Sequence, residues 1–105
     1  MNGEQLKDFV VDKADDLKAV DIKTLDVRGK SSVCEFLVIC SGTSRTHVNA
    51  IAENVVTEAK QTGMQPLGIE GKAGGEWVLV DLGDVVLHVM QEQTRDFYQL
   101  EKLWG

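Results

Sequence analysis

The chain has little cysteine, and its cysteines are not spaced for metal or redox chemistry. Cys34 and Cys40 are the only two among 105 residues. They stand six positions apart and therefore lack the C-x-x-C spacing of zinc and redox sites. Cys40 ends the apolar run Phe36 to Cys40, where a buried free thiol behaves as a small hydrophobic residue. We expect both thiols to be structural, without a disulfide bond or a bound metal.

Long apolar runs and targeting signals are also missing. No apolar run approaches the roughly 20 residues that a helix needs to span a bilayer. The amino terminus is acidic, and it shows neither a basic segment followed by an apolar one nor an Arg/Ser-rich stretch. We therefore expect no membrane association and cytoplasmic residence.

Basic residues are outnumbered by acidic ones. The chain has 11 Lys and Arg against 17 Asp and Glu, for a net charge of −6. A nucleic-acid binder would show a basic patch or stripe, so direct nucleic-acid recognition is not expected. An acidic surface is better suited to a basic partner, because the two electrostatic potentials are then complementary.

Apolar periodicity divides the chain into helices and strands, without linkers or repeats. We expect three helices. The first begins after Asn2, which forms a capping box with Gln5. The second begins after Thr43 or Ser44 and ends at Gly63, and the third covers Phe97 to Trp104. The expected strands are Ile22 to Val27, a central Phe36 to Cys40, an edge strand Pro66 to Gly71, and a hairpin within Glu76 to Met90. The order αββαβββα predicts one α/β domain over residues 1–105, with a mixed sheet of about five strands and three main helices.

The hairpin Glu76 to Met90, EWVLVDLGDVVLHVM, contains the most informative pattern. A two-residue Gly83-Asp84 turn places Trp77 opposite Met90, Leu79 opposite His88 and Asp81 opposite Val86. Side chains alternate between the two faces of a strand. One face is then wholly aliphatic and predicts core: Val78, Val80, Leu82, Val85, Leu87 and Val89. The other mixes large apolar with ionisable groups: Trp77, Leu79, Asp81, Val86, His88 and Met90.

We expect this second face to stay at least partly open and to bind a partner. Exposed apolar patches mark interaction sites, and Trp is enriched at binding hot spots. In the alternative, the last helix folds over Trp77 and Met90 and makes them core. Asp81 and His88 count against that alternative, because burying ionisable groups is costly unless they are paired.

Enzymatic alternatives have weak support in the sequence. Ser41-Gly42-Thr43-Ser44 before a helix could hold a phosphate, but it also reads as a helix cap. The D-x-D pair of nucleotidyltransferases is absent, and no Ser or Thr lies between Trp77 and Met90 to act with His88 as a nucleophile. Glu70 and Asp81 could share a metal ion if their strands pair, but no second histidine is positioned to complete such a site. We expect no catalytic residue, metal or cofactor, and a capping or solvated role for His47.

The hairpin run W-V-L-V-D-L-G-D-V-V-L-H-V-M resembles the signature of the Iojap/RsfS family, the ribosomal silencing factors. Further similar pieces occur in order across almost the whole chain: Leu25-Asp26-Val27, Ser41 to Ser44, Pro66 to Gly71, and Arg95 with Tyr98 to Trp104. The first-helix segments, from Asp8 to Lys18, are similar to gammaproteobacterial members.

The resemblance implies a nucleotidyltransferase-like fold without that chemistry. It implies binding to the large ribosomal subunit through large-subunit ribosomal protein fourteen, which keeps the small subunit from joining and represses translation when nutrients are short. The implied contact residues are Trp77, Leu79, Asp81, Glu70, Asp84, His88 and Met90. Two departures are Glu35, where the family usually has Asp, and Thr46, where an Arg is common and Arg45 stands one step earlier.

Two other functions remain as alternatives. One is a metal-dependent nucleotidyltransferase-like enzyme, which would bind nucleotide with magnesium. The other is a homodimerisation module, in which the open hairpin face would meet a second copy of the chain.

Overall fold

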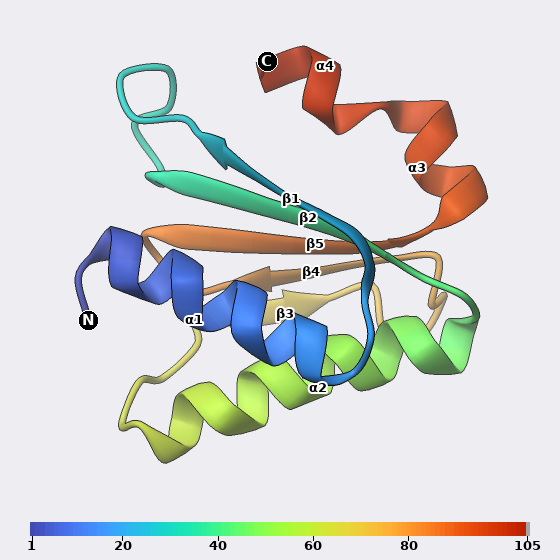
Figure 1. The fold of residues 1–105 in the computed structure, drawn as a ribbon, viewed down its shortest axis with the longest axis horizontal. Coiled ribbons are helices and arrows are strands. Elements are labelled where there is room, and N and C mark those ends of the chain that lie inside the picture. The colour runs from blue at the N-terminus through green and yellow to red at the C-terminus, as the bar shows by residue number, and fades with distance from the viewer. Residues whose placement is uncertain (105) are drawn as a thin grey trace.

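Five strands form one mixed sheet in the order β1-β2-β5-β4-β3 (Figure 1). The computed structural model describes residues 1–104, without the side chain of Trp104. The strands are β1 (Val20–Asp26), β2 (Phe36–Gly42), β3 (Gly68–Glu70), β4 (Trp77–Asp81) and β5 (Val85–Gln91). Only β2 and β5 pair in parallel, and the other neighbours are antiparallel. The predicted α/β class, the mixed sheet and the edge position of the third strand are confirmed.

Helices lie on both faces of the sheet. They are α1 (Gly3–Asp16), α2 (Arg45–Gln61), α3 (Glu92–Tyr98) and α4 (Leu100–Trp104). Helices α1 and α2 cover one face, while α3 and α4 lie on the other (Figure 1). The expected last helix is interrupted at Gln99, whose φ of 49° is left-handed, so it becomes two short helices. No helix within residues 1–104 is both long enough and apolar enough to cross a bilayer.

The two long helices begin where the sequence predicts. The side chain of Asn2 accepts from the amide of Gln5 at 2.8 Å, and the Gln5 side chain accepts from the amide of Asn2 at 3.0 Å. This is the predicted capping box. Ser44, rather than Thr43, caps α2 by accepting from the amide of His47 at 3.0 Å.

The hairpin has the predicted register. Trp77 pairs with Met90, Leu79 with His88, and Asp81 with Val86. The amide of Leu82 donates to the carbonyl of Val85 at 2.9 Å and closes the turn. Gly83 adopts a φ of 87°, a conformation that favours glycine, which explains its place at the head of the turn.

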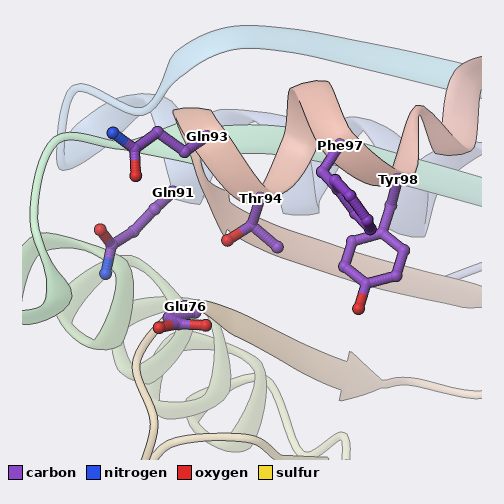
Figure 2. Close-up of a pocket in the computed structure, with 6 residues that line it drawn as sticks. All are labelled: Glu76, Gln91, Gln93, Thr94, Phe97 and Tyr98. Carbon is purple, nitrogen blue, oxygen red and sulfur yellow. The ribbon is translucent and has the colours of Figure 1, made fainter.

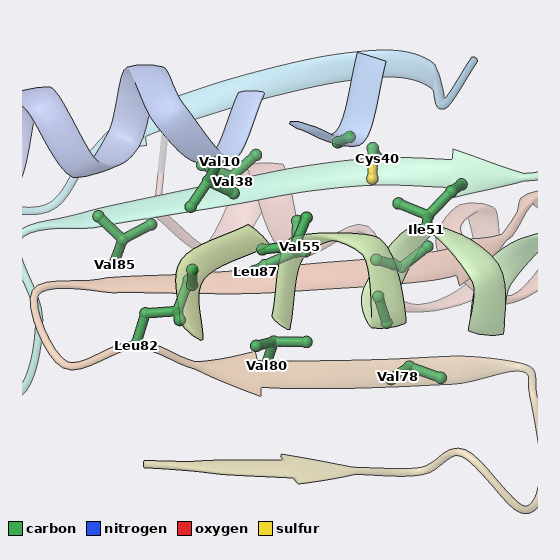
Figure 3. Packing of buried hydrophobic residues seen from close by; sticks show 14 of the residues in the cluster. Val10, Val38, Cys40, Ile51, Val55, Val78, Val80, Leu82, Val85 and Leu87 are labelled. Carbon is green, nitrogen blue, oxygen red and sulfur yellow. The ribbon is translucent and has the colours of Figure 1, made fainter. Parts of the chain in front are cut away.

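The main core lies between the sheet and helices α1 and α2 (Figure 3). It includes the whole aliphatic face of the hairpin, whose members are 0–4% exposed: Val78, Val80, Leu82, Val85, Leu87 and Val89. Leu6 and Val10 of α1 and Ile51 and Val55 of α2 pack against them. Fully burying such side chains contributes about 1.5–3 kcal/mol each, so this face dominates the stability of the fold.

Candidate partner-binding surface

The β3–β4 half of the second sheet face is open to solvent. Glu70 on β3 pairs with Leu79 on β4, so their side chains share one face with Trp77 and Asp81. Glu70 is exposed, and the other three are half-buried. We call these four residues the β4 strip. Trp77, Leu79 and Glu70 also line a shallow depression. The expectation of a partly open face therefore holds for this half of the hairpin.

Met90 departs from the expectation, because it is fully buried. It belongs to the predicted open face, but α3 begins at Glu92, directly after β5, and turns back over β5 and β2. The prediction that Met90 is exposed for a partner is therefore wrong. The alternative, in which the end of the chain covers Met90, is correct at this position.

Arg95 holds the covering segment in place. Its side chain is 7% exposed. The Nε atom donates to Oε1 of Glu101 at 2.6 Å, and Nη1 donates to Oγ of Ser41 at 2.9 Å. Its Nη2 lies 3.7 Å from the carboxylate of Asp21. A buried guanidinium is tolerated only when it is paired, so these bonds tie α3 and α4 to β1 and β2. In the sequence, Arg95 stands out only as part of a motif, and no local pattern indicates this role.

Trp77 is bonded to a histidine of its own chain. The indole Nε1 donates to Nδ1 of His88 at 2.9 Å, and the two ring centroids lie 5.9 Å apart. The ring of Tyr98, on α3, packs on the indole with centroids 4.8 Å apart. Trp77 is thus covered on one side and stays half-buried rather than sealed.

His88 is not an open contact residue. It is 9% exposed, and burial lowers its pKa from 6.5 to about 4. It is therefore neutral near pH 7. Because Nδ1 accepts from the indole, the ring proton lies on Nε2. The prediction that His88 lies open to a partner is wrong, since the ring serves mainly to orient Trp77.

The two acidic groups of the hairpin differ in their local roles. One carboxylate oxygen of Asp81 accepts from the amide of Gly83 at 2.9 Å, which stabilises the turn. Asp84 is exposed, and its backbone carbonyl accepts from the amides of Glu35 and Phe36. Both stand at the end of the β4 strip. In the described residues, no three His, Cys, Asp or Glu side chains are grouped to hold a metal ion.

The Ser41-Gly42-Thr43-Ser44 turn uses its donors internally. The amide of Thr43 donates to Nδ1 of His47 at 2.9 Å, and Nε2 of His47 lies 2.7 Å from the carbonyl of Leu17. His47 thus joins the end of α1 to the start of α2, beyond its expected capping role. A Cβ on Gly42 would lie 2.7 Å from Cγ2 of Val48, so glycine is needed there for close packing. These contacts favour the structural interpretation of the turn.

The thiols and Arg45 are also accounted for by local structure. Burial raises the pKa of Cys40 to about 12 and raises that of Cys34, so both thiols are poor nucleophiles. Nη2 of Arg45 donates to the carbonyl of Ala73. Arg45 therefore supports the loop that leads into β4 and stands where α2 begins.

A polar hollow with an aromatic wall lies beside the β4 strip (Figure 2). We call it the acid–aromatic hollow; it is lined by Glu76, Gln91, Gln93, Thr94, Phe97 and Tyr98. Phe97 is 81% exposed and Tyr98 is 51% exposed. The sequence pattern placed Phe97 in an expected last helix and did not predict this site.

Comparison with known proteins gives consistent matches along the chain. A family model described as "Ribosomal silencing factor during starvation" matches residues 2–105. A ribosomal silencing factor from Haemophilus influenzae is 48% identical over 100 residues, which cover 95% of this chain and 98% of that protein. A crystal structure of a Chromobacterium violaceum protein, 38% identical, matches with a TM-score of 0.98 and covers 100% of this chain and 88% of that one. The mouse protein "Mitochondrial assembly of ribosomal large subunit protein 1" is 37% identical over 89 residues, or 82% of this chain and 39% of that protein.

Proposed function

We propose, because this chain belongs to the ribosomal silencing factor family, that it docks on the large ribosomal subunit and keeps the small subunit from joining. As a member of this family, the chain is a translation regulator that associates with the ribosome. The finer proposal names the partner, large-subunit ribosomal protein fourteen, and the occasion, repression of translation when nutrients are short.

The β4 strip is the observation that carries this proposal. It places a half-buried indole and Leu79 beside the carboxylates of Glu70 and Asp81. An apolar centre with a charged rim is the usual anatomy of a protein interface. The chain's net charge of −6 suits a basic ribosomal protein, and carboxylates form strong charge-assisted hydrogen bonds with Lys or Arg. Asp84 would extend the acidic rim beyond the turn.

Support for the large subunit comes from a relative. The name of the mouse protein refers to assembly of the large ribosomal subunit. We carry that association to this chain as a proposal.

The chain would act by occupying a surface of the large subunit and would catalyse no reaction. The molecule measures 31 × 31 × 21 Å along its principal axes. A body of that thickness, docked on the surface of the large subunit that faces the small one, would hold the two subunits apart. A standard interface buries about 800 Å² on each partner. Trp77 and Leu79 would form its apolar centre, while buried His88 and Met90 would shape it from beneath.

Two variants test the β4 strip by cosedimentation with isolated large subunits. Trp77→Ala should weaken binding by about 2 kcal/mol, or roughly thirtyfold, because truncated hot-spot aromatics lose that much. Glu70→Lys should also weaken binding, and the loss should shrink at high salt, because a rim charge acts through long-range attraction.

The matched control for charge is Asp15→Lys. Asp15 is exposed on α1, on the opposite side of the sheet. Its replacement by Lys changes the charge by the same amount as Glu70→Lys does. It should leave binding nearly unchanged. Circular dichroism must show that each variant is folded. A folded Trp77→Ala variant that binds as tightly as wild type would exclude this surface. Binding to small subunits instead of large ones would refute the proposed partner.

A further inference from the structure

We propose that the acid–aromatic hollow receives an arginine side chain of the basic protein on which the chain docks. This inference rests on the proposed function and deepens it, because it names the group that is recognised at one end of the β4 strip. The hollow lies between the start of β4 and α3 (Figure 2).

The aromatic wall is unusually exposed for such large rings. Phe97 and Tyr98 are 81% and 51% exposed, and their ring centroids are 5.1 Å apart at an angle of 79°. Tyr98 in turn packs on Trp77 of the strip at 4.8 Å. The three rings therefore form a continuous wall from the hollow to the strip. Ring faces attract cations through their quadrupole. Within the described residues, the chain's own cation–π contacts lie at Phe36 and Phe9.

The opposite side of the hollow is negative. Glu76 is exposed, and its backbone carbonyl accepts from the amide of Gln91 at 2.9 Å, which fixes the start of β4 beside the start of α3. No salt bridge involves Glu76 among residues 1–104. The Arg45 side chain packs against Gly75, beside Glu76, but its guanidinium donates to the carbonyl of Ala73. Arg95 is buried and paired with Glu101.

Arginine fits this combination better than other side chains. Its planar guanidinium stacks on aromatic rings and bonds a carboxylate with two parallel N–H groups. The ammonium of lysine is a compact, strongly hydrated point charge, so it gains less from a ring face. An apolar side chain would desolvate Glu76 without pairing it, which is costly. A nucleic-acid phosphate would be repelled by the same carboxylate.

The first test uses short peptides and does not depend on the ribosome. Hexa-arginine and hexa-lysine are titrated into the ¹⁵N-labelled protein, and amide resonances are followed by NMR. Hexa-arginine should shift Glu76, Phe97 and Tyr98 selectively and bind about fivefold more tightly than hexa-lysine. Phe97→Ala should abolish the preference. Equal binding of both peptides, or shifts spread over the acidic surface, would overturn the assignment.

The second test measures binding to isolated large subunits. Phe97→Ala and Glu76→Gln should each weaken binding about fivefold. The double variant should weaken binding by less than the product of the two single fold-changes, because both side chains contact the same cation. Tyr98→Phe keeps the ring and should bind normally.

Matched controls are Leu103→Ala, which removes another exposed apolar side chain, and Asp15→Asn, which removes a carboxylate from the opposite side of the sheet. Neither should weaken binding. If wild type binds large subunits and neither hollow variant weakens that binding, the hollow assignment alone fails. If wild type does not bind them at all, the proposed function fails, and the arginine assignment fails with it.

Discussion

The two faces of the sheet are built from alternate residues of the same strands, yet different interactions hold them. The face toward α1 and α2 carries only aliphatic hairpin residues, each 0–4% exposed. The face toward α3 and α4 carries the buried polar side chains of Ser41 and His88 together with half-buried Trp77 and Leu79, and Arg95 of α3 is buried against it. The first face is sealed by packing alone. The second combines a small apolar cluster of Val27, Leu37 and Val86 with a polar network, and it stays partly open.

The length of the covering helices explains the difference. Helices α1 and α2 have 14 and 17 residues, and each lays a continuous apolar stripe on the sheet. Helices α3 and α4 have seven and five residues, too few to cover the sheet or to be stable by themselves. Arg95 supplies the missing attachment. Surfaces that bind partners are drawn from such less stable parts of a fold, because full packing would leave nothing exposed.

A pair of identical truncations, one on each face, should show the largest difference in stability between the two faces. Leu87→Ala, on the sealed face, should lower the free energy of unfolding by about 4 kcal/mol, because it leaves a cavity in fully buried packing. Leu79→Ala, on the open face, should lower it by only about 1 kcal/mol, because that side chain is only partly buried. Urea denaturation measures both losses.

Ribosome binding should reverse the order of the two variants. Leu79→Ala should weaken binding to large subunits, while the folded fraction of Leu87→Ala should bind as wild type does. Equal losses of stability would show that the two faces are equally packed and that neither is the more open one.

The sealed face could be predicted from the sequence almost residue by residue. Gly83 fixes a two-residue turn, the turn fixes the register, and the two-residue period of a strand then assigns each side chain to a face. These are local interactions, and no distant segment competes with them. The caps at Asn2 and Ser44 were predictable for the same reason.

The open face could be predicted only in part. Trp77, Leu79 and Asp81 stay accessible as expected, but Val86, His88 and Met90 are buried. The burial of Met90 depends on α3, whose position is set by bonds from Arg95 to partners such as Ser41, 54 positions away. His88 is bonded to the indole of Trp77, on which Tyr98 of α3 packs. Single-sequence periodicity carries no information about such contacts. The exposed ring of Phe97 was missed because a short helix shows too little periodicity to tell its packed side from its free side.

A second prediction concerns pH and the buried imidazole. Burial lowers the pKa of His88 to about 4, whereas the unfolded chain should titrate near 6.5. Between these values the unfolded state binds more protons, so stability falls as pH falls from 6.5 to 4 and His88 contributes no further change below that. The full loss from this group is about 3 kcal/mol. Protonation also removes the acceptor at Nδ1 that holds the indole of Trp77.

Urea denaturation of wild type and His88→Asn at several pH values isolates this contribution. Asn has no titrating group, so the difference in unfolding free energy between the two proteins should shrink by about 3 kcal/mol from pH 7 to pH 4. Other titrating groups affect both proteins alike and cancel in the difference. Two parallel curves would show that His88 is not desolvated as described.

The smallest expected effect is that of Met90→Leu, and it separates a buried support from a contact residue. Met90 is fully buried beneath α3, so a swap of similar volume should cost only about 1 kcal/mol of stability. Because no atom of Met90 reaches the surface, binding to large subunits should match wild type within error. Trp77→Ala, at the residue that pairs with Met90 and lies on the same face of the hairpin, provides the contrast, since it should lose binding. Tighter or weaker binding of a stable Met90→Leu variant would mean that α3 lifts away when the partner docks, since only then could the partner touch position 90.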